Sequence, residues 1–259
     1  MRPGNYPEQA ATYDQTRSAS RWIVEAVAAH LGAGAGRSLA DVAGGTGNYA
    51  RAFADRGFRV TIVDAEPAML ARSVEKLGPG HGVVGDAAAL PLRDGAVDAA
   101  VLISAIHLFA DAAGALREVR RVIRDGPFVL MAFTLENLRP LFVYDYFGGR
   151  WPDEIRTSRA DLEGLVRDAG FAEVTVRHLV FRDATDGSLA ALHTDPRGLA
   201  DPARLRNTSF WHRIDQATRR EGLDALERDL RSGALDRRVQ ESLRLAEAHG
   251  HGSVFVATT

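Results

Sequence analysis

The sequence contains no cysteine among its 259 residues. Disulfide bonds, cysteine-ligated metal sites and thiol catalysis are therefore excluded. It also contains only one lysine, Lys76, within a total of 32 lysine and arginine residues. This bias toward arginine indicates a GC-rich genome and predicts no function by itself. The first 17 residues have no apolar run typical of a signal peptide, so we expect a cytoplasmic protein.

An excess of charge of one sign is lacking too, because the formal net charge is −2. The chain therefore offers no basic footprint for nucleic acid or an anionic membrane. The most apolar segment, Val97–Ala110, is too short to span a bilayer and contains Asp98 and His107. The histidines show no spacing typical of a metal site. We expect a small-molecule substrate, no nucleic-acid, membrane or metal partner, and a monomer or homodimer.

Apolar runs alternate with helix-like stretches from Ser38 to Ala132, a pattern typical of a parallel α/β sheet covered on both faces. Two further runs follow later in the chain. The last of them, "GSVFVATT", is expected to return to the sheet as an edge or penultimate strand. The predicted strands are residues 38–43, 58–64, 81–86, 97–105, 127–134, 172–181 and 252–259.

A glycine-rich turn, "AGGTGN", joins the first predicted strand to the helix after it. Glycines let the backbone approach a ligand closely, and the N–H groups of the helix start point toward it. Gly45 and Gly47 fit the first two positions of the dinucleotide fingerprint, and Ala50 fits the alanine variant of the third. From these residues alone, NAD and other nucleoside cofactors all remain candidate ligands.

The segment "DVAGGTG", Asp41 to Gly47, resembles the first motif of the class I S-adenosylmethionine-dependent methyltransferases, an acid followed by G-x-G-x-G. Ala43 departs from that motif at its first glycine. Three further matches follow in the family's order, and together the resemblance covers residues 13–181. They are "VTIVD" with Asp64, "GDAAALPL" with Asp86 and Ala87, and "VDAAVLISAIHLFAD" with the helix and strand that follow it.

The resemblance implies a Rossmann-like, doubly wound, mostly parallel sheet of seven strands in the order 3-2-1-4-5-7-6, with S-adenosylmethionine as cofactor. It assigns the ribose to Asp64, because a carboxylate accepts two hydrogen bonds from a vicinal diol. It assigns the adenine to Asp86 and to the backbone N–H of Ala87. The other implied cofactor contacts are Tyr13 as a lid, Asp41, Ala43, Gly44, Gly45, Gly47, Ala65 and Ser104.

In this arrangement the chain reads as one compact domain with three parts. Residues 1–36 are expected to form a helical lid, and residues 37–182 the cofactor-binding core. Residues 183–259 supply a helical insertion and the final strand. The insertion is interpreted as a lid, a dimer surface or plain coverage of the sheet.

His107 lies just past the fourth predicted strand, at the carboxyl edge where ligands bind in open α/β sheets. An unperturbed histidine titrates near ~6.5, which suits a catalytic base. His107 is therefore a candidate base or acceptor-positioning residue, with a pocket-wall role as the alternative. An aromatic insertion at residues 135–157 is expected to cover the substrate, although core packing explains such residues as well. Its candidate substrate contacts are Tyr144, Tyr146, Phe147 and Trp151.

The favoured function is methyl transfer to an oxygen or nitrogen atom of a small, hydrophobic or aromatic metabolite, as in specialised metabolism. One alternative is a cofactor-binding protein with a cyclase-like or regulatory role, because a fold does not fix a function. Another is nucleic-acid or protein methylation. Nucleic-acid amino-methylating enzymes carry an Asn/Asp-Pro-Pro-aromatic turn after the fourth strand, and this chain has "SAIH" there.

Overall fold

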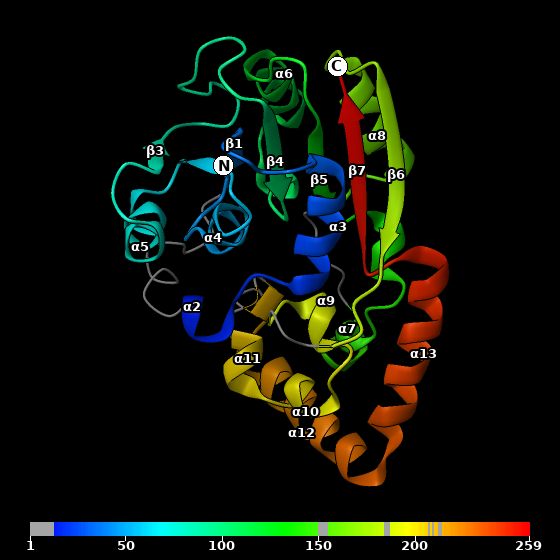
Figure 1. Ribbon diagram of the computed structural model, residues 1–259. Helices are drawn as coiled ribbons and strands as arrows, with labels where there is room; N and C mark the ends of the chain where they lie inside the picture. Colours follow the sequence, from blue (N-terminus) through cyan, green and yellow to red (C-terminus); the bar gives the residue numbers. More distant parts are fainter. Residues whose placement is uncertain (1–12, 150–154, 184–186, 207, 209, 212–213) are drawn as a thin grey trace.

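The computed structural model describes residues 13–149, 155–183, 187–206, 208, 210–211 and 214–259. Within these residues seven strands form one sheet in the order β3-β2-β1-β4-β5-β7-β6 (Figure 1), which confirms the predicted topology. The pairings among β1 to β5 are parallel, and β7 runs antiparallel to both of its neighbours. The strands are β1 (Ser38–Val42), β2 (Arg59–Asp64), β3 (Gly82–Val84), β4 (Ala99–Ile103), β5 (Phe128–Ala132), β6 (Glu173–Leu179) and β7 (Gly252–Thr258).

The central strands are uniform apolar runs because both of their faces are covered. Every residue of β4 and β5 is buried, whereas the edge strand β6 has several exposed residues. The final run, β7, pairs with β5 and β6 and is therefore the penultimate strand of the sheet.

Helices cover both faces of the sheet (Figure 1). Side chains of α3 and α4 join the hydrophobic core on one face, and those of α6 and α8 join the core on the other. The helices of the sheet layer are α2 (Tyr13–Thr16), α3 (Arg21–Leu31), α4 (Asn48–Ala54), α5 (Pro67–Leu77), η1 (Ile106–Leu108), α6 (Ala112–Val122), η2 (Leu135–Leu138) and α8 (Arg159–Asp168).

Local signals in the sequence explain where these helices begin. The side chain of Ser158 accepts a hydrogen bond from the Asp161 N–H at the start of α8. Glu66 caps α5 in the same way, and Pro67 occupies the first helical position, where no N–H is needed. Because α5 starts directly after β2, these signals place its first turn at the carboxyl edge of the sheet.

The remaining helices form what we call the cap, which lies on the side of the sheet toward which the β4 arrow points (Figure 1). The cap has an aromatic core in which the Phe147 ring packs edge-on against Phe210 and Trp211, with centroid distances of 5.3 and 5.9 Å. This core is continuous with the α3 side of the sheet. The cap helices are α7 (Val143–Tyr146), α9 (Leu189–Leu192), α10 (Pro196–Leu199), α11 (Pro202–Arg206), α12 (Gln216–Ser232) and α13 (Ala234–His249).

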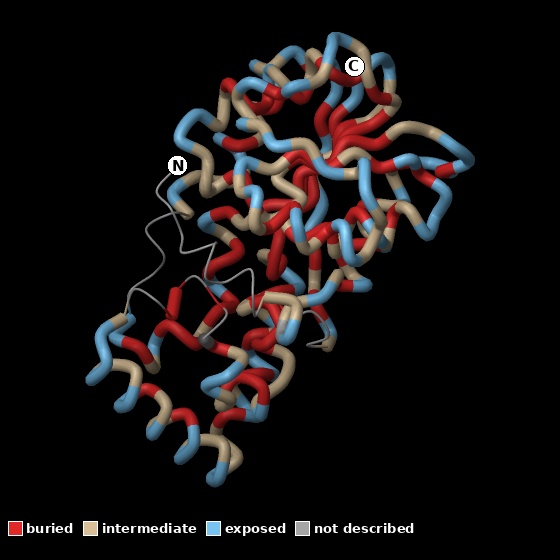
Figure 2. The backbone as a smooth tube through the Cα atoms, turned by 90° about the vertical axis from the view of Figure 1, so that its left-hand side faces the viewer, coloured by how far each residue is buried: buried red, intermediate tan, exposed pale blue. Residues whose placement is uncertain are grey.

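Buried residues follow the strands through the middle of the molecule, and exposed residues lie at its periphery (Figure 2). In the part of the chain that the structure describes, no helix combines the length and apolar character needed to cross a membrane.

Candidate active site

A cavity of about 250 Å³ lies at the carboxyl ends of β1 to β5. Because the strand order is 3-2-1-4-5, its walls run from Asp86 after β3, past Asp64 and Asp41, to Ser104 and Phe133 after β4 and β5. The strand order reverses between β1 and β4, which is where open α/β sheets bind their ligands. The cavity is therefore the candidate active site.

The structure brings almost all of the predicted cofactor contacts together in this pocket. Only Gly47 is not among the described lining residues. Gly47 instead begins α4 with a left-handed φ of +77°, and a Cβ there would lie 2.9 Å from Ser73 Cβ of α5. The predicted residues that line the pocket are Tyr13, Asp41, Ala43, Gly44, Gly45, Asp64, Ala65, Asp86, Ala87 and Ser104.

The glycine loop packs directly against two carboxylates. A Cβ on Gly44 would lie 2.7 Å from the Asp41 carboxyl group, so a side chain at Gly44 would push the loop out of place. The Gly45 N–H donates to Asp64 Oδ2 at 2.8 Å. Of the acids that the resemblance assigns to cofactor binding, Asp64 therefore binds the loop through a hydrogen bond, and Asp41 packs closely beneath it.

Asp64 is oriented by backbone donors on both of its oxygens. Besides the Gly45 contact, Oδ1 accepts from the Glu66 N–H at 2.9 Å. Burial raises the pKa of Asp64, while these two hydrogen bonds lower it by a smaller amount. Each carboxylate oxygen has a second lone pair, so the group can still accept two hydrogen bonds from a diol.

Asp41 is the most electrostatically unusual group in the pocket. It is 1% exposed, and its Oδ2 has no hydrogen-bond partner among the described residues. Burial and then the nearby charge of Asp64 raise its pKa to about 7. The residue lines the pocket, but this oxygen lies under the glycine loop, 2.7 Å from where a Gly44 Cβ would be, so a cationic group in the pocket would act on Asp41 through its charge.

Two pocket residues have backbone conformations that favour glycine. Ala43 and Ser104 follow β1 and β4 with φ values of +56° and +57°. Ala43 thus has a backbone conformation that favours glycine, the residue that the motif has at this position, and its N–H donates to Val63 O at 2.7 Å. Left-handed backbone at residues other than glycine is uncommon and gathers at functional sites.

The segment before α3 also reaches the pocket. Tyr13, Arg17 and Ser18 all line it, and the Arg17 guanidinium lies 5.6 Å from the centre of the Tyr13 ring. Arg17 also donates to Gly187 O at 3.3 Å, on the cap side of the pocket. Sequence reasoning missed Arg17, although its signal was present in the same "YDQTR" segment as Tyr13.

His107 lies in η1, half-buried, with its ring edge-on to Phe133 at a centroid distance of 6.4 Å. It is not among the described lining residues, whereas Leu108 and Phe109 are. A role as base or acceptor contact therefore stays a prediction.

The predicted aromatic substrate contacts lie in the cap. Tyr144 and Phe147 are buried in its aromatic core, and the Tyr146 hydroxyl donates to Asp229 of α12. None of the three lines the pocket, and Trp151 falls outside the described residues. The aromatic side chains that do line it beyond the N-terminal segment are Tyr49, Phe109 and Phe133. Single aromatic residues at the ends of apolar runs carried no sequence signal for such a role.

A family model described as a methyltransferase domain matches residues 40–131. The ubiquinone/menaquinone biosynthesis C-methyltransferase of Caulobacter vibrioides NA1000 is 31% identical over an alignment of 204 positions, which covers 65% of this chain and 79% of that protein. The chain belongs to the class I S-adenosylmethionine-dependent methyltransferases. A malonyl-[acyl-carrier protein] O-methyltransferase of Serratia marcescens is 30% identical over 127 residues, 49% of this chain and 50% of that protein.

Among solved structures, a putative methyltransferase from an antibiotic biosynthesis pathway of Anabaena variabilis has a TM-score of 0.82 at 28% identity. The match covers 95% of this chain and 99% of that one, so the similarity extends over the cap as well as the sheet. The cofactor of this methyltransferase is S-adenosylmethionine. Its chemistry fits the pocket, because the Asp64 carboxylate lines the pocket and can accept hydrogen bonds from a ribose diol, and Asp41 adds a second acid beneath the glycine loop.

Proposed function

We propose that this methyltransferase transfers the methyl group of S-adenosylmethionine to an oxygen or nitrogen atom of a small, hydrophobic or aromatic metabolite. The proposal rests on one observation: a single continuous pocket has an acidic part at one end and a more apolar part at the other. Its β3, β2 and β1 ends present Asp86, Asp64 and Asp41. The residues after β4 and β5 include Leu108 and Phe133, which are apolar.

The order of the strands supports an order of contacts along the cofactor. Asp86 and the Ala87 N–H would hold the adenine, and Asp64 the ribose hydroxyls. The glycine loop and Ser104 would hold the amino-acid moiety, with Asp41 facing its ammonium group. When bound, the cofactor supplies a methyl group on a positively charged sulfur. The chain then has to align the acceptor with that methyl, and positioning of this kind removes up to about 7–11 kcal/mol from a barrier.

The choice of oxygen or nitrogen follows from the scarcity of bases near the acceptor end. Among the described lining residues that follow β4 and β5, Asp111 is the only titratable one. Its Oδ1 already accepts from the Gly114 N–H at 2.7 Å, which caps α6. An acceptor that is nucleophilic without a catalytic base, such as an amine or a phenolate, suits this site best. The contact between His107 and Phe133 supports a role for His107 in shaping the pocket.

A second candidate is C-methylation of a quinone precursor, which the activity named for the Caulobacter relative favours. Incubation with methyl-labelled S-adenosylmethionine and a panel of aromatic amines, phenols and hydroquinones separates the two. Label on oxygen or nitrogen, located by NMR of the product, supports the proposal. Label on a ring carbon supports the second candidate instead, and label recovered only in nucleic acid or protein contradicts both.

A further inference from the structure

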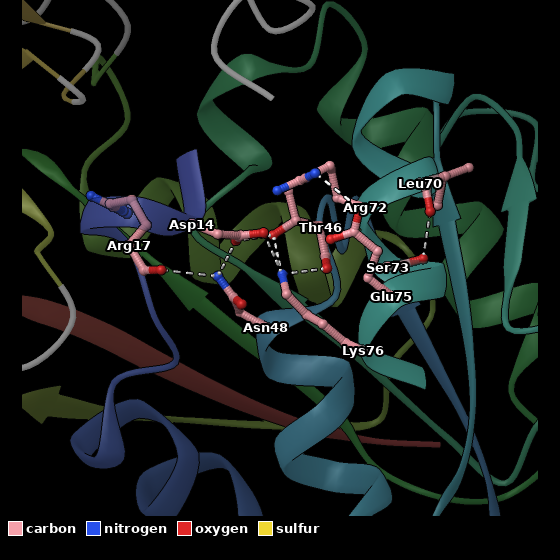
Figure 3. Close-up of polar contacts among 9 residues, drawn as sticks. All are labelled: Asp14, Arg17, Thr46, Asn48, Leu70, Arg72, Ser73, Glu75 and Lys76. Carbon is pink, nitrogen blue, oxygen red and sulfur yellow. Dashed lines mark hydrogen bonds and ion pairs between the residues drawn. The ribbon is translucent and has the colours of Figure 1, made fainter. Parts of the chain in front are cut away.

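Four polar residues from separate elements meet behind the glycine loop (Figure 3). Asp14 comes from α2, Thr46 from the glycine loop, Asn48 from the start of α4 and Lys76 from the last turn of α5. We call this cluster the latch. It joins the segment that carries Tyr13 and Arg17 to the loop at the centre of the candidate active site.

Lys76 occupies the centre of the latch and uses its whole hydrogen-bonding capacity there. Its Nζ donates to Asp14 Oδ2 at 2.8 Å, to Thr46 O at 2.8 Å and to Thr46 Oγ1 at 2.9 Å. An ammonium group has three donors around one point, whereas the planar guanidinium of arginine spreads its donors along a fork. The one lysine of an arginine-rich chain thus stands where three acceptors converge.

Asp14 is held as firmly from the other side. Its Oδ1 accepts from Thr46 Oγ1 at 2.8 Å and from Asn48 Nδ2 at 3.1 Å. Asn48 Nδ2 also lies 3.4 Å from Arg17 O, so it contacts the next turn of the same segment.

The Asp14–Lys76 pair is more enclosed than an ordinary surface ion pair. The two side chains are 21% and 23% exposed, against 36% and 62% for Arg72 and Glu75, which form another ion pair on the same α5 helix. Partial burial and multiple charge-assisted hydrogen bonds strengthen an ion pair, and exposed pairs contribute little. Arg72 therefore provides a matched control on the same helix.

Two of the four latch residues, Thr46 and Asn48, line the pocket, and the other two are set back from it. Asp14 and Lys76 do not line the pocket, whereas Tyr13, Arg17 and Thr46 do. The helix that carries Asp14 has only four residues, and a helix this short is not stable by itself. The position of Tyr13 and Arg17 at the pocket therefore depends on tertiary contacts, among which the latch supplies hydrogen bonds to both carboxylate oxygens of Asp14.

We propose that Lys76 and Asp14 are positioning residues that hold the Tyr13–Arg17 segment against the glycine loop and thereby set how long the cofactor stays bound. This inference rests on the proposed cofactor pocket. Asp14 and Lys76 do not line the pocket. Loss of their ion pair should therefore raise the dissociation rate of the cofactor without removing a side chain that contacts it.

The test measures the dissociation rate of S-adenosylhomocysteine by stopped-flow displacement for wild type, Lys76→Gln, Asp14→Asn, the double variant and the control Arg72→Gln. Each single latch variant is expected to release the ligand about tenfold faster, and the control to stay within about twofold of wild type. The double variant should be no more than about twofold faster than the single variants, because both remove the same interaction. Wild-type rates in both single variants, equal effects in the control, or additive effects in the double variant would overturn the proposal.

A second measurement uses the fact that Lys76 is the only lysine. Acylation of its side chain by an amine-reactive reagent, followed by peptide mass spectrometry, reports opening of the latch without any ligand. Asp14→Asn should acylate several-fold faster than wild type, and Arg72→Gln at the wild-type rate. Failure of wild type to bind S-adenosylhomocysteine would contradict the proposed function, while equal acylation of wild type and Asp14→Asn would contradict the latch.

Discussion

The pocket edge of the sheet and the aromatic core of the cap are both buried, but the polar groups named here differ in whether they have hydrogen-bond partners. At the pocket edge, Asp41 Oδ2 lacks a partner among the described residues, and Ala43 has left-handed backbone. In the cap, His193 Nε2 accepts from the Val143 N–H at 3.1 Å, and the Tyr146 hydroxyl donates to Asp229.

This difference separates binding from stability. Buried polar groups in proteins are normally paired, so a carboxylate oxygen without a partner beside left-handed backbone is typical of a site shaped for a ligand. Satisfied polar groups among packed rings mark a structural core. Changes in the cap should therefore affect the free energy of unfolding, and changes at the pocket edge should affect ligand binding.

The largest expected effect is in the cap. Phe147 is 1% exposed, and Phe147→Ala should lower the free energy of unfolding by about 3–5 kcal/mol through lost burial and a cavity. Urea unfolding measures this. The folded variant should keep wild-type affinity for S-adenosylhomocysteine and a wild-type KM for the acceptor.

Phe133→Ala is the matched change at the pocket, and it should raise the acceptor KM about tenfold while costing less stability than Phe147→Ala. A raised acceptor KM in Phe147→Ala without a loss of stability would restore the interpretation of the aromatic insertion as a substrate cover.

The second prediction concerns acid denaturation of the cap. Burial lowers the pKa of His193 to about 3, so the ring stays neutral in the folded protein. The unfolded chain takes up this proton near ~6.5, so the stability from His193 is complete above that pH and is lost as pH falls toward 3.

Between pH 7.5 and 5.0 the loss from this group should be about 2 kcal/mol, measured by urea unfolding at both pH values. His193→Gln should lower stability at pH 7.5 and show a flatter pH dependence. An unchanged slope in that variant would contradict the assignment.

The third prediction concerns Asp41. Its pKa is raised to about 7, whereas the pKa of His193 is lowered. As pH rises from about 4 to 7, the free protein loses stability from this group, because the folded state binds its proton more tightly. A cofactor ammonium group would favour the ionised carboxylate. Binding should therefore release a proton below pH 7. As the pH is lowered below 7, the affinity for the cofactor should fall by up to about tenfold per pH unit.

Calorimetry with S-adenosylhomocysteine in buffers of different ionisation heat counts the released protons. Asp41→Asn should abolish both the proton release and the pH dependence, while Asp55→Asn at the exposed end of α4 should keep them. The same proton release in wild type and Asp41→Asn would rule out Asp41 as the titrating group.

The smallest expected effect tests backbone strain at the pocket edge. Ala43→Gly restores the family's residue at a φ of +56° and should raise the free energy of unfolding by about 0.5 kcal/mol. The control Ala40→Gly lies in the middle of β1, three residues before Ala43. It should lower the free energy of unfolding by about 1 kcal/mol or more. Equal losses of stability in the two variants would contradict strain at Ala43.

Much of the sheet and the polar half of the pocket could be predicted from the sequence. Strand ends of a parallel sheet lie side by side, so Asp41, Asp64 and Asp86 had to meet once their strands were identified. The acceptor half could not be predicted, because Phe133 and Ser188 come together only through the placement of the cap. The Asp14–Lys76 contact joins residues 62 positions apart, and local periodicity carries no information about it.

The most direct test of the account is calorimetric titration of S-adenosylhomocysteine and of NAD into wild type and Asp64→Asn. The substitution places an amide N–H group among backbone donors and removes the carboxylate that would accept the ribose hydroxyls under the proposed function. We predict one-to-one binding of S-adenosylhomocysteine to wild type, about 100-fold weaker binding to Asp64→Asn, and no binding of NAD. Equal affinity of the two proteins for S-adenosylhomocysteine, or a preference for NAD, would contradict the assignment of this pocket.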